Sequence, residues 1–259
     1  MIKITTMMKR REGMTPDAFK EYWCERHTPL TKRAIPEEVA PIRQIHNYTV
    51  PFGEGWDPPF DGIKSLCFTD AQRFLEWDEW FRDQGADILS EDELNFVDPG
   101  TRVRLVVEER VIVPERKGAG GERTGGESPP MVKLMAMLKR KKGMAAQQFS
   151  RYWYEEHGPM AVRVIPESVR IRRYVQNHAL LLPRVGDPCF DGIVEFCLEG
   201  MDSVNAWMAF YASDEGKVIR DDEIRFIDVN EMVVLMVEER VILFRRKQPR
   251  RSKDEVSGF

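Results

Sequence analysis

A motif that occurs twice, 130 residues apart, constrains this sequence more than any other feature. Residues 19–29 read FKEYWCERHTP and residues 149–159 read FSRYWYEEHGP, so Phe, Tyr-Trp, Glu, His and Pro recur in the same order. The same offset relates other identities, which are FDGI at 60–63 and 190–193 and VEERVI at 107–112 and 237–242. Because the offset never changes, no net insertion separates the copies, and the chain is a tandem duplication of a unit of about 115 residues.

The segment between the copies defines their boundaries. Residues 114–130 are rich in Gly, Pro and charge and contain no apolar run to bury, which is typical of a flexible linker. Residues 245–259 at the end of the chain are polar in the same way. We therefore expect one unit at 1–113, a second unit at 131–244, and a polar tail.

Each unit alternates strand-like and helix-like stretches in the order βαββαβ. Apolar, β-branched stretches predict strands, and stretches with a 3.6-residue period predict helices. In the first unit the expected strands are 1–8, 42–50, 63–68 and 103–113, and the expected helices are 15–27 and 71–81. Thr15 is the expected N-cap of the first helix, and Pro29 is expected to end it. Residues 85–98 are expected to form a long connection that can hold a helical turn.

This order is the split βαβ of the ferredoxin-like fold, in which both helices cover one face of a four-stranded antiparallel sheet. The other face is apolar and must also be covered. Because the unit is duplicated, packing the two open sheet faces together satisfies both units. We therefore predict the α+β class, with two tandem ferredoxin-like units that form an intramolecular dimeric α+β barrel around an internal space.

Composition and charge argue against several kinds of partner. The chain has 32% charged residues and a formal net charge of -4, so it lacks the excess positive charge that would favour binding to nucleic acid or an anionic membrane. No run reaches the ~18 apolar residues of a membrane span, and the first residues lack the layout of a signal peptide. The four cysteines form no CxxC pair and no metal-ligand spacing. We expect a cytoplasmic protein with a small-molecule substrate and no metal, nucleic acid or membrane partner; the sequence leaves a homodimer open.

His27 and His157 are the leading candidates for proton chemistry. On a helix the spacing i, i+4, i+8 puts Phe19, Trp23 and His27 on one face, with the histidine at the helix C-terminus. There the macrodipole favours the protonated imidazole. Two interpretations remain open: a general acid or base near neutral pH, or a side chain that caps its own helix by donating to free carbonyls.

Four more residues of the repeat are candidate catalytic residues. Asp61 and Asp191 each precede a glycine at the start of a strand, where they either form a turn or present a carboxylate that partners the histidine. Tyr22 and Tyr152 could donate a phenol to a substrate carbonyl or carboxylate, although such a tyrosine is more often a core residue.

A second set of residues is expected to contact substrate. These are two pairs on matching strands and one residue in a loop, namely Asn47 and Asn177, His46 and His178, and Trp56. The two histidines of this set are not repeat partners. The loops 52–59 and 181–188 also differ, and both lie near the expected mouth of a half-barrel. We therefore predict two related pockets with different ligand preference, of which only one is strongly catalytic.

The sequence lacks the usual cofactor motifs. It has no Gly-rich phosphate cradle after a strand, no HxH or HxxxH metal pair and no nucleophile elbow. We therefore expect no cofactor. Haem stays open as an alternative, because a single histidine suffices as its axial ligand.

Four motifs taken together resemble the EthD family. They are KRxxGM after the first strand, FxxYWxExHxP, Asp-Gly before the third strand and DExxF before the fourth, and each occurs in both copies. The resemblance covers 1–113 and 131–244. It implies the fold of the dimeric α+β barrel superfamily, formed here within one chain.

What the resemblance implies about function is broader. The founding member is needed for bacterial degradation of a fuel ether, and some fungal members look like cofactor-free decarboxylases or dehydratases of aromatic polyketide acids. The resemblance thus implies a cofactor-independent lyase or isomerase that uses histidine acid–base chemistry on an apolar aromatic or polyketide-like small molecule. The alternatives are a non-catalytic small-molecule-binding accessory protein of a catabolic pathway and, less expected, a haem-binding enzyme.

Overall fold

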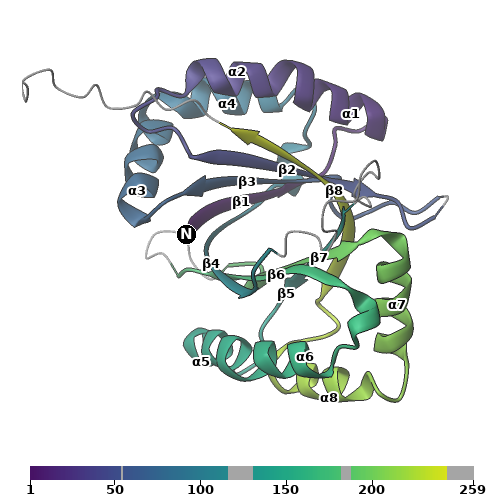
Figure 1. Cartoon of the computed structure of the whole chain (residues 1–259). Coiled ribbons are helices and arrows are strands. Elements are labelled where there is room, and N and C mark those ends of the chain that lie inside the picture. Colours follow the sequence, from purple (N-terminus) through teal and green to yellow (C-terminus); the bar gives the residue numbers. More distant parts are fainter. Residues whose placement is uncertain (54, 116–130, 182–187, 244–259) are drawn as a thin grey trace, which may run out of the picture.

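Eight antiparallel strands close into a single barrel in the computed structural model, which describes residues 1–53, 55–115, 131–181 and 188–243. The order around the barrel is β1-β3-β2-β8-β5-β7-β6-β4 (Figure 1). The strands of the first half are β1 (Ile2–Met8), β2 (Arg43–Val50), β3 (Gly62–Phe68) and β4 (Val103–Val113). Those of the second half are β5 (Met131–Leu138), β6 (Ile171–Ala179), β7 (Gly192–Glu199) and β8 (Val233–Leu243). The predicted linker and tail lie almost entirely outside the described residues.

Two seams of backbone hydrogen bonds join the halves. Strand β2 of the first half pairs with β8 of the second, and β4 of the first half pairs with β6 of the second. Within each half the strand order is the same, β4-β1-β3-β2 and β8-β5-β7-β6. Each half therefore covers the edges of the other, and among the described strands closure leaves no sheet edge to pair with another chain. The predicted α+β class, with a barrel closed within one chain, is confirmed.

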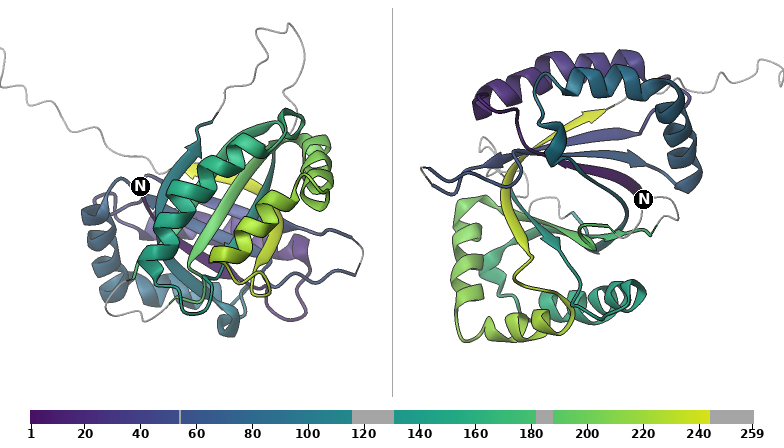
Figure 2. Two further views of the ribbon diagram at one scale, coloured as in Figure 1. Left: turned by 90° about the horizontal axis from the view of Figure 1, so that it is seen from below. Right: turned by 180° about the vertical axis from the view of Figure 1, so that it is seen from behind.

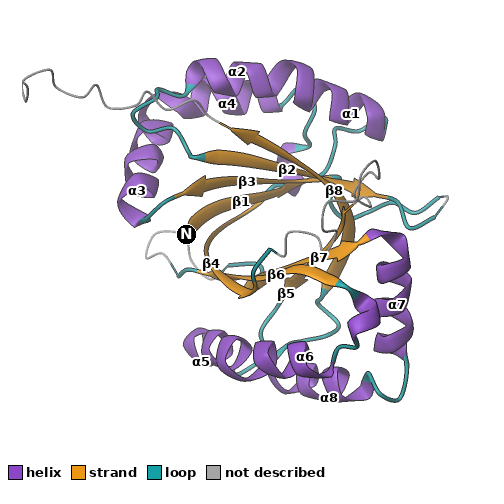
Figure 3. Cartoon of the chain, in the orientation of Figure 1, coloured by secondary structure: helices purple, strands orange, loops and turns teal. Residues whose placement is uncertain are grey.

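Helices surround the barrel on its outside, and each half carries its own set (Figures 2 and 3). In the first half they are α1 (Pro16–Tyr22), α2 (Thr28–Ala34), α3 (Ala71–Trp80) and α4 (Ala86–Glu93). In the second half they are α5 (Ala146–Tyr152), α6 (Gly158–Val164), α7 (Gly200–Ala212) and α8 (Lys217–Phe226). Among the described residues, none of these helices combines the length and the hydropathy that crossing a membrane requires.

The helix that carries the first histidine does not end at Pro29, contrary to the expectation. A π-helical turn, Trp23–His27, connects α1 to α2, and the Thr28 N–H donates to the carbonyl of Trp23. In an ordinary α-turn the proline ring would collide with the carbonyl four residues earlier, and the wider π turn relieves that collision. His27 therefore lies inside a continuous helical segment, and so does His157 in the equivalent turn Trp153–His157.

The space inside the barrel is filled by side chains, so the predicted internal space between the sheets is wrong. Apolar side chains from both halves form this core, namely Met7, Phe60, Ile63, Leu105, Val107, Met135, Met137, Ile193, Leu235 and Val237. Alternate residues of the same strands point outward instead, and they pack under the helices. Room for a ligand must therefore be sought between a sheet and its helices.

Charged side chains complete the barrel interior and cross between the halves. Lys3 lies 2.6 Å from Glu109 and 2.7 Å from Glu195, while Lys133 lies 2.7 Å from Glu195 and 2.6 Å from Glu239. Burial alone would raise the pKa of Glu195, but Lys133 and Lys3 hold it well below its ordinary value. Glu195 is thus a buried anion that binds one lysine from each half.

Candidate functional site

Each half contains the same three-residue arrangement of tyrosine, aspartate and histidine. In the second half His157 Nδ1 lies 2.8 Å from Asp222, and the Tyr152 hydroxyl donates to the other oxygen of that carboxylate at 2.6 Å. In the first half the matching distances, from His27 and Tyr22 to Asp92, are 2.7 and 3.1 Å. The carboxylate fixes the orientation of the ring and leaves Nε2 as the nitrogen that is free to act.

The helical segment packs this arrangement against the sheet, and the glycine of the Asp-Gly motif allows the close contact. The π turn places Trp153 and His157 on the inner side of the helix, where both are buried. The indole of Trp153 packs on Gly192, and a Cβ at that position would collide with it; Trp23 and Gly62 repeat this contact. The glycine of the Asp-Gly motif is therefore required by close packing.

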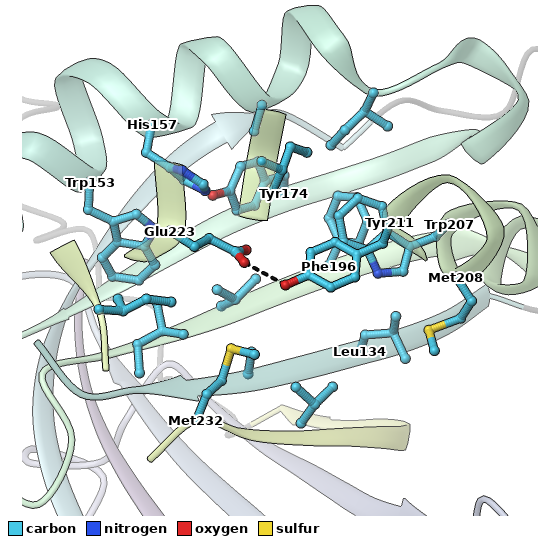
Figure 4. A pocket seen from close by; sticks show the side chains of 18 of the residues that line it. Leu134, Trp153, His157, Tyr174, Phe196, Trp207, Met208, Tyr211, Glu223 and Met232 are labelled. Carbon is cyan, nitrogen blue, oxygen red and sulfur yellow. Dashed lines mark hydrogen bonds between the residues drawn. The ribbon is translucent and has the colours of Figure 1, made fainter. Parts of the chain in front are cut away.

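A cavity of about 410 Å³ lies between the second-half sheet and its helices (Figure 4). Its wall is almost wholly apolar or aromatic, formed by Leu134, Ala136, Leu138, Trp153, Ala161, Ile165, Tyr174, Val194, Phe196, Val204, Trp207, Met208, Tyr211, Ile219, Phe226, Ile227, Met232, Val234 and, from the first half, Phe52. The two remaining lining residues, His157 and Glu223, are ionisable. The volume is in the usual range for small-molecule sites.

The close-up in Figure 4 shows how the polar groups of this cavity are distributed. His157, Tyr174 and Glu223 lie toward one end of the cavity, and Leu134, Met208 and Met232 lie on the opposite side. The Tyr211 hydroxyl donates to Glu223 at 2.5 Å. The cavity thus presents hydrogen-bonding groups at one end and an apolar surface over the rest.

The equivalent place in the first half is nearly closed, with about 20 Å³ left. Lys64 and Arg104 occupy the positions that Val194 and Val234 hold in the second half. Lys64 donates to Glu93 at 2.6 Å, and Arg102 donates to the same carboxylate at 2.8 Å. These cations fill the volume that stays open in the second half.

The two equivalent glutamates have opposite electrostatic environments. Burial raises the pKa of Glu223 above its ordinary value, and the hydrogen bond from Tyr211 only partly opposes this. Burial would also raise the pKa of Glu93, but Lys64, His27 and Arg102 lower it to about 2. Glu93 is therefore a fixed anion, whereas Glu223 is shifted toward the protonated form, as a proton donor requires.

The surroundings of His27 disfavour its protonated form, whereas the sequence predicted that the helix dipole would favour it. Burial lowers the pKa of His27, and the charge of Lys64 lowers it further. The helix continues past the histidine, so no free carbonyl end lies beside the ring. The same continuity removes the interpretation of either histidine as a C-terminal cap.

Asp61 and Asp191 are not the carboxylates that hydrogen-bond His27 and His157. Asp61 accepts hydrogen bonds from the backbone N–H and the guanidinium of Arg10, and Asp191 does the same with Arg140. Each aspartate thus anchors the end of the first strand of its half. The carboxylates that do contact the histidines are Asp92 and Asp222, on a segment expected to be mainly a connection but found as helix α4 or α8.

None of the expected substrate-contacting residues lines the large cavity; the two asparagines and two histidines are buried, and Trp56 is partly buried. Asn47 and Asn177 donate to backbone carbonyls of the neighbouring strand. His46 stacks on Trp23 and His178 packs on Trp153, at ring separations of 4.1 and 4.5 Å. Burial, with Arg110 nearby, lowers the pKa of His178 to about 3. Trp56 packs against the barrel core.

Strand β2 and its counterpart β6 differ in the residues next to the indoles of Trp23 and Trp153. Positions 44, 46 and 48 carry Gln, His and Tyr, whereas positions 174, 176 and 178 carry Tyr, Gln and His. The change puts Tyr174 in the cavity wall, where burial raises its pKa to about 12. Gln176 donates to the Tyr174 hydroxyl at 3.1 Å. Tyr174 was not expected at the site, because its repeat partner is a glutamine.

Comparison with known proteins identifies the family to which this chain belongs. The sequence profile described as the EthD domain matches residues 11–100 and again residues 141–230. The chain belongs to the EthD family. It is thus a tandem EthD protein, and the matched segments include both histidines and both of their aspartate partners. No curated protein sequence matches this EthD chain.

Solved structures similar to this EthD chain are distant in sequence. An anthrone oxidase-like protein has a TM-score of 0.56 at 10% identity, over 93% of this chain and 92% of that one. An EthD family protein from Bacillus halodurans, 22% identical, covers 42% of this chain and 98% of its own length with a TM-score of 0.32. A haem-binding protein from Thermus thermophilus has a TM-score of 0.43 at 10% identity, over 91% and 90%. The likeness to the first of these shows a shared fold.

Proposed function

We propose that the second half is a cofactor-independent enzyme, a lyase or isomerase, that moves protons on a largely apolar small molecule. The observation that carries the proposal is the cavity of about 410 Å³, whose wall contains the imidazole of His157 and the carboxyl of Glu223. Proton transfer in an apolar site needs a base and an acid that both reach the substrate, with pKa values set by their surroundings.

The contacts of these two residues support the following proton-transfer roles within the proposal. His157 donates its Nδ1–H to Asp222, so Nε2 accepts a proton from the substrate. Tyr152 holds Asp222 in place and acts as a positioning residue. Glu223, whose pKa burial raises, returns a proton to a substrate oxygen or carbon. A proton taken by one group and returned by the other isomerises a carbonyl compound, and loss of a protonated hydroxyl as water completes a dehydration.

The first half supports the fold in this proposal and takes no part in the reaction. Its His27, Tyr22 and Asp92 keep the same hydrogen bonds, but Lys64 and Arg104 leave only about 20 Å³ beside them. The prediction of two related sites of which one is catalytic thus becomes a proposal about the second half. We likewise propose that Asp61, Asp191, Asn47, Asn177, His46, His178 and Trp56 serve packing and backbone anchoring.

A non-catalytic carrier of apolar molecules is the second candidate, because the cavity wall is almost wholly apolar. Haem fits the cavity poorly. Its two propionates are anions that cationic partners would stabilise, and none of the described lining residues is Lys or Arg. His157, the lining histidine, suits a neutral organic substrate better than a dianionic macrocycle.

An exchange experiment tests the proposal even though the natural substrate is unidentified. Purified protein, without added metal or cofactor, is incubated in D₂O with a panel of aromatic ketones, phenols and hydroxy acids, and deuterium uptake at carbon is followed by NMR. His157→Gln is expected to lower the exchange rate by ~10²–10⁴-fold. His27→Gln is the matched control and should leave the rate unchanged.

The outcomes separate the two candidates. Exchange that survives His157→Gln would exclude the acid–base role of this residue. Binding of panel members by the wild type without any exchange would favour the carrier.

The description of each half as a ferredoxin-like unit is also a proposal. It is supported by the strand order β4-β1-β3-β2, repeated as β8-β5-β7-β6, and by the helices on one side of each sheet. Cytoplasmic location and association into a homodimer stay predictions.

A further inference from the structure

We propose that the ligand of the second-half cavity is uncharged, with a carbonyl or hydroxyl oxygen at one end and an apolar body, and that Val194 and Val234 determine this selectivity. The inference rests on the cavity of the proposed function, although it does not require that catalysis takes place there. It narrows the ligand expected from the sequence, an apolar aromatic or polyketide-like small molecule, to an uncharged one.

The first half shows what a charged version of this site contains. The twelve residues that line its small remaining space all have repeat partners in the wall of the large cavity. At five of these positions a polar or cationic residue of the first half corresponds to a less polar residue of the second half, namely Thr6 and Ala136, Thr31 and Ala161, Gln44 and Tyr174, Lys64 and Val194, and Arg104 and Val234. Arg102, which also binds Glu93, has Met232 as its partner. The second half therefore has no cation at any of the three places where the first half has one.

A bound anion would lack a counter-charge in this wall. None of the described lining residues is Lys or Arg, and Glu223 lies in the wall itself. His157 is already paired with the Asp222 carboxylate at 2.8 Å. Moving a carboxylate from water into such a place removes its hydration and supplies nothing equivalent, so the site selects against anions.

The polar end of the cavity fits a single neutral oxygen. The Tyr174 hydroxyl, His157 Nε2 and the Glu223 carboxyl lie toward that end (Figure 4). Apart from the Tyr211 hydroxyl, which donates to Glu223, the rest of the wall is apolar or aromatic and includes Leu134, Met208 and Met232. A ketone or phenol satisfies the polar groups and buries its hydrocarbon body against the remainder.

Isothermal titration with two probes of similar shape tests the inference at pH 7.5. The probes are 2-acetylnaphthalene, a neutral ketone, and 2-naphthoate, the corresponding carboxylate. Wild-type protein is expected to bind the ketone at least about 10²-fold more tightly than the carboxylate. Equal binding, or tighter binding of the carboxylate, would overturn the inference, and so would no binding of either probe at millimolar concentration.

A substitution that restores the first-half residue tests the role of Val194. Val194→Lys is expected to weaken ketone binding at least about tenfold, because the new side chain fills the cavity and pairs with Glu223 as Lys64 pairs with Glu93. Val194→Met adds similar length without charge. Equal loss in the two variants would show that volume, and not charge, sets the preference. If the lysine variant does not fold, as judged by circular dichroism, the wild-type probe pair still decides.

The results also distinguish this inference from the proposed function. Ketone binding without deuterium exchange removes catalysis and leaves the neutral-ligand inference intact. Deuterium exchange on a carboxylate substrate that is lost in His157→Gln would support catalysis and contradict the neutral-ligand inference.

Discussion

Lys64→Met is the substitution that most directly tests how the first half closes its cavity. Methionine keeps the length of the lysine stem but removes the ammonium that lies 2.6 Å from Glu93. Both side chains are buried or nearly so. The variant therefore leaves a buried carboxylate with Arg102, at 2.8 Å, as its remaining direct cation.

The expected loss follows from the titration of Glu93. Its pKa falls from the ordinary 4.5 to about 2, where Lys64, His27 and Arg102 outweigh the opposing effect of burial. At about 1.4 kcal/mol for each pKa unit, this shift corresponds to roughly 3–4 kcal/mol of folding free energy. Lys64 is the largest of the favourable contributions, so we expect Lys64→Met to cost about 2–3 kcal/mol at pH 7.

The sign of the pH dependence is fixed by the direction of the shift. A carboxyl whose pKa is lower in the folded state adds stability above pH 4.5, and that stability is lost as the pH falls toward 2. The difference between wild type and Lys64→Met should therefore shrink across this window, because Glu93 becomes protonated in the unfolded chain below about pH 4.5 but in the folded wild type only near pH 2.

Urea unfolding at pH 7, 4 and 3, followed by circular dichroism, measures this difference. Val194→Met, at the equivalent position in the second half, is the control, since it has no ammonium to lose and should change stability by about 1 kcal/mol or less at every pH. A loss in Lys64→Met that stays constant from pH 7 to pH 3 would refute the assigned role of the ion pair.

Four further substitutions have definite expectations. Trp77→Ala should cost ~3–5 kcal/mol, because the indole is buried, and Trp207→Ala should cost less, because Trp207 is only half-buried beside the cavity; thermal unfolding of the two variants compares them. Glu223→Gln should raise the melting temperature at pH 7 more than at pH 4, since a carboxyl with a raised pKa destabilises the fold only above its ordinary pKa; equal changes at both pH values would contradict the buried-acid assignment. Gly192→Ala should cost ~1–3 kcal/mol through its collision with Trp153, and an unchanged unfolding midpoint would show that the indole can move.

The repeat made the architecture predictable, because duplication of a unit with one uncovered sheet face has few solutions. The sequence could not show how the sheets meet. Pairing of β2 with β8 and of β4 with β6 depends on strand edges, which carry no side-chain pattern of their own. The π turn was equally hidden, since Pro29 ends an α-helix in most contexts and continues it here only because the preceding turn is wider.

The sequence indicated the histidine and the tyrosine of each Tyr-Asp-His arrangement but not the aspartate that both contact. Asp92 and Asp222 were missed because residues 85–98 were assigned mainly to a connection, although the retained Asp-Glu pair in both copies was a usable signal. The contrast between Lys64 and Val194 was also visible in the sequence. Its meaning depends on which face of a strand each residue occupies, and that became clear only with the strand register.

The two seams join halves of one chain, and this affects how the sequence of the protein can evolve. When a barrel forms from two identical chains, each substitution appears in both subunits, so one site cannot be given up without losing the other. Covalent linkage removes that constraint, and the two halves differ where identical subunits could not: Ser65 stands at the position of Glu195, and Lys64 at the position of Val194. One half is therefore free to become a scaffold while the other keeps an open site. The same differences make the halves complementary to each other, and neither half is matched to a copy of itself.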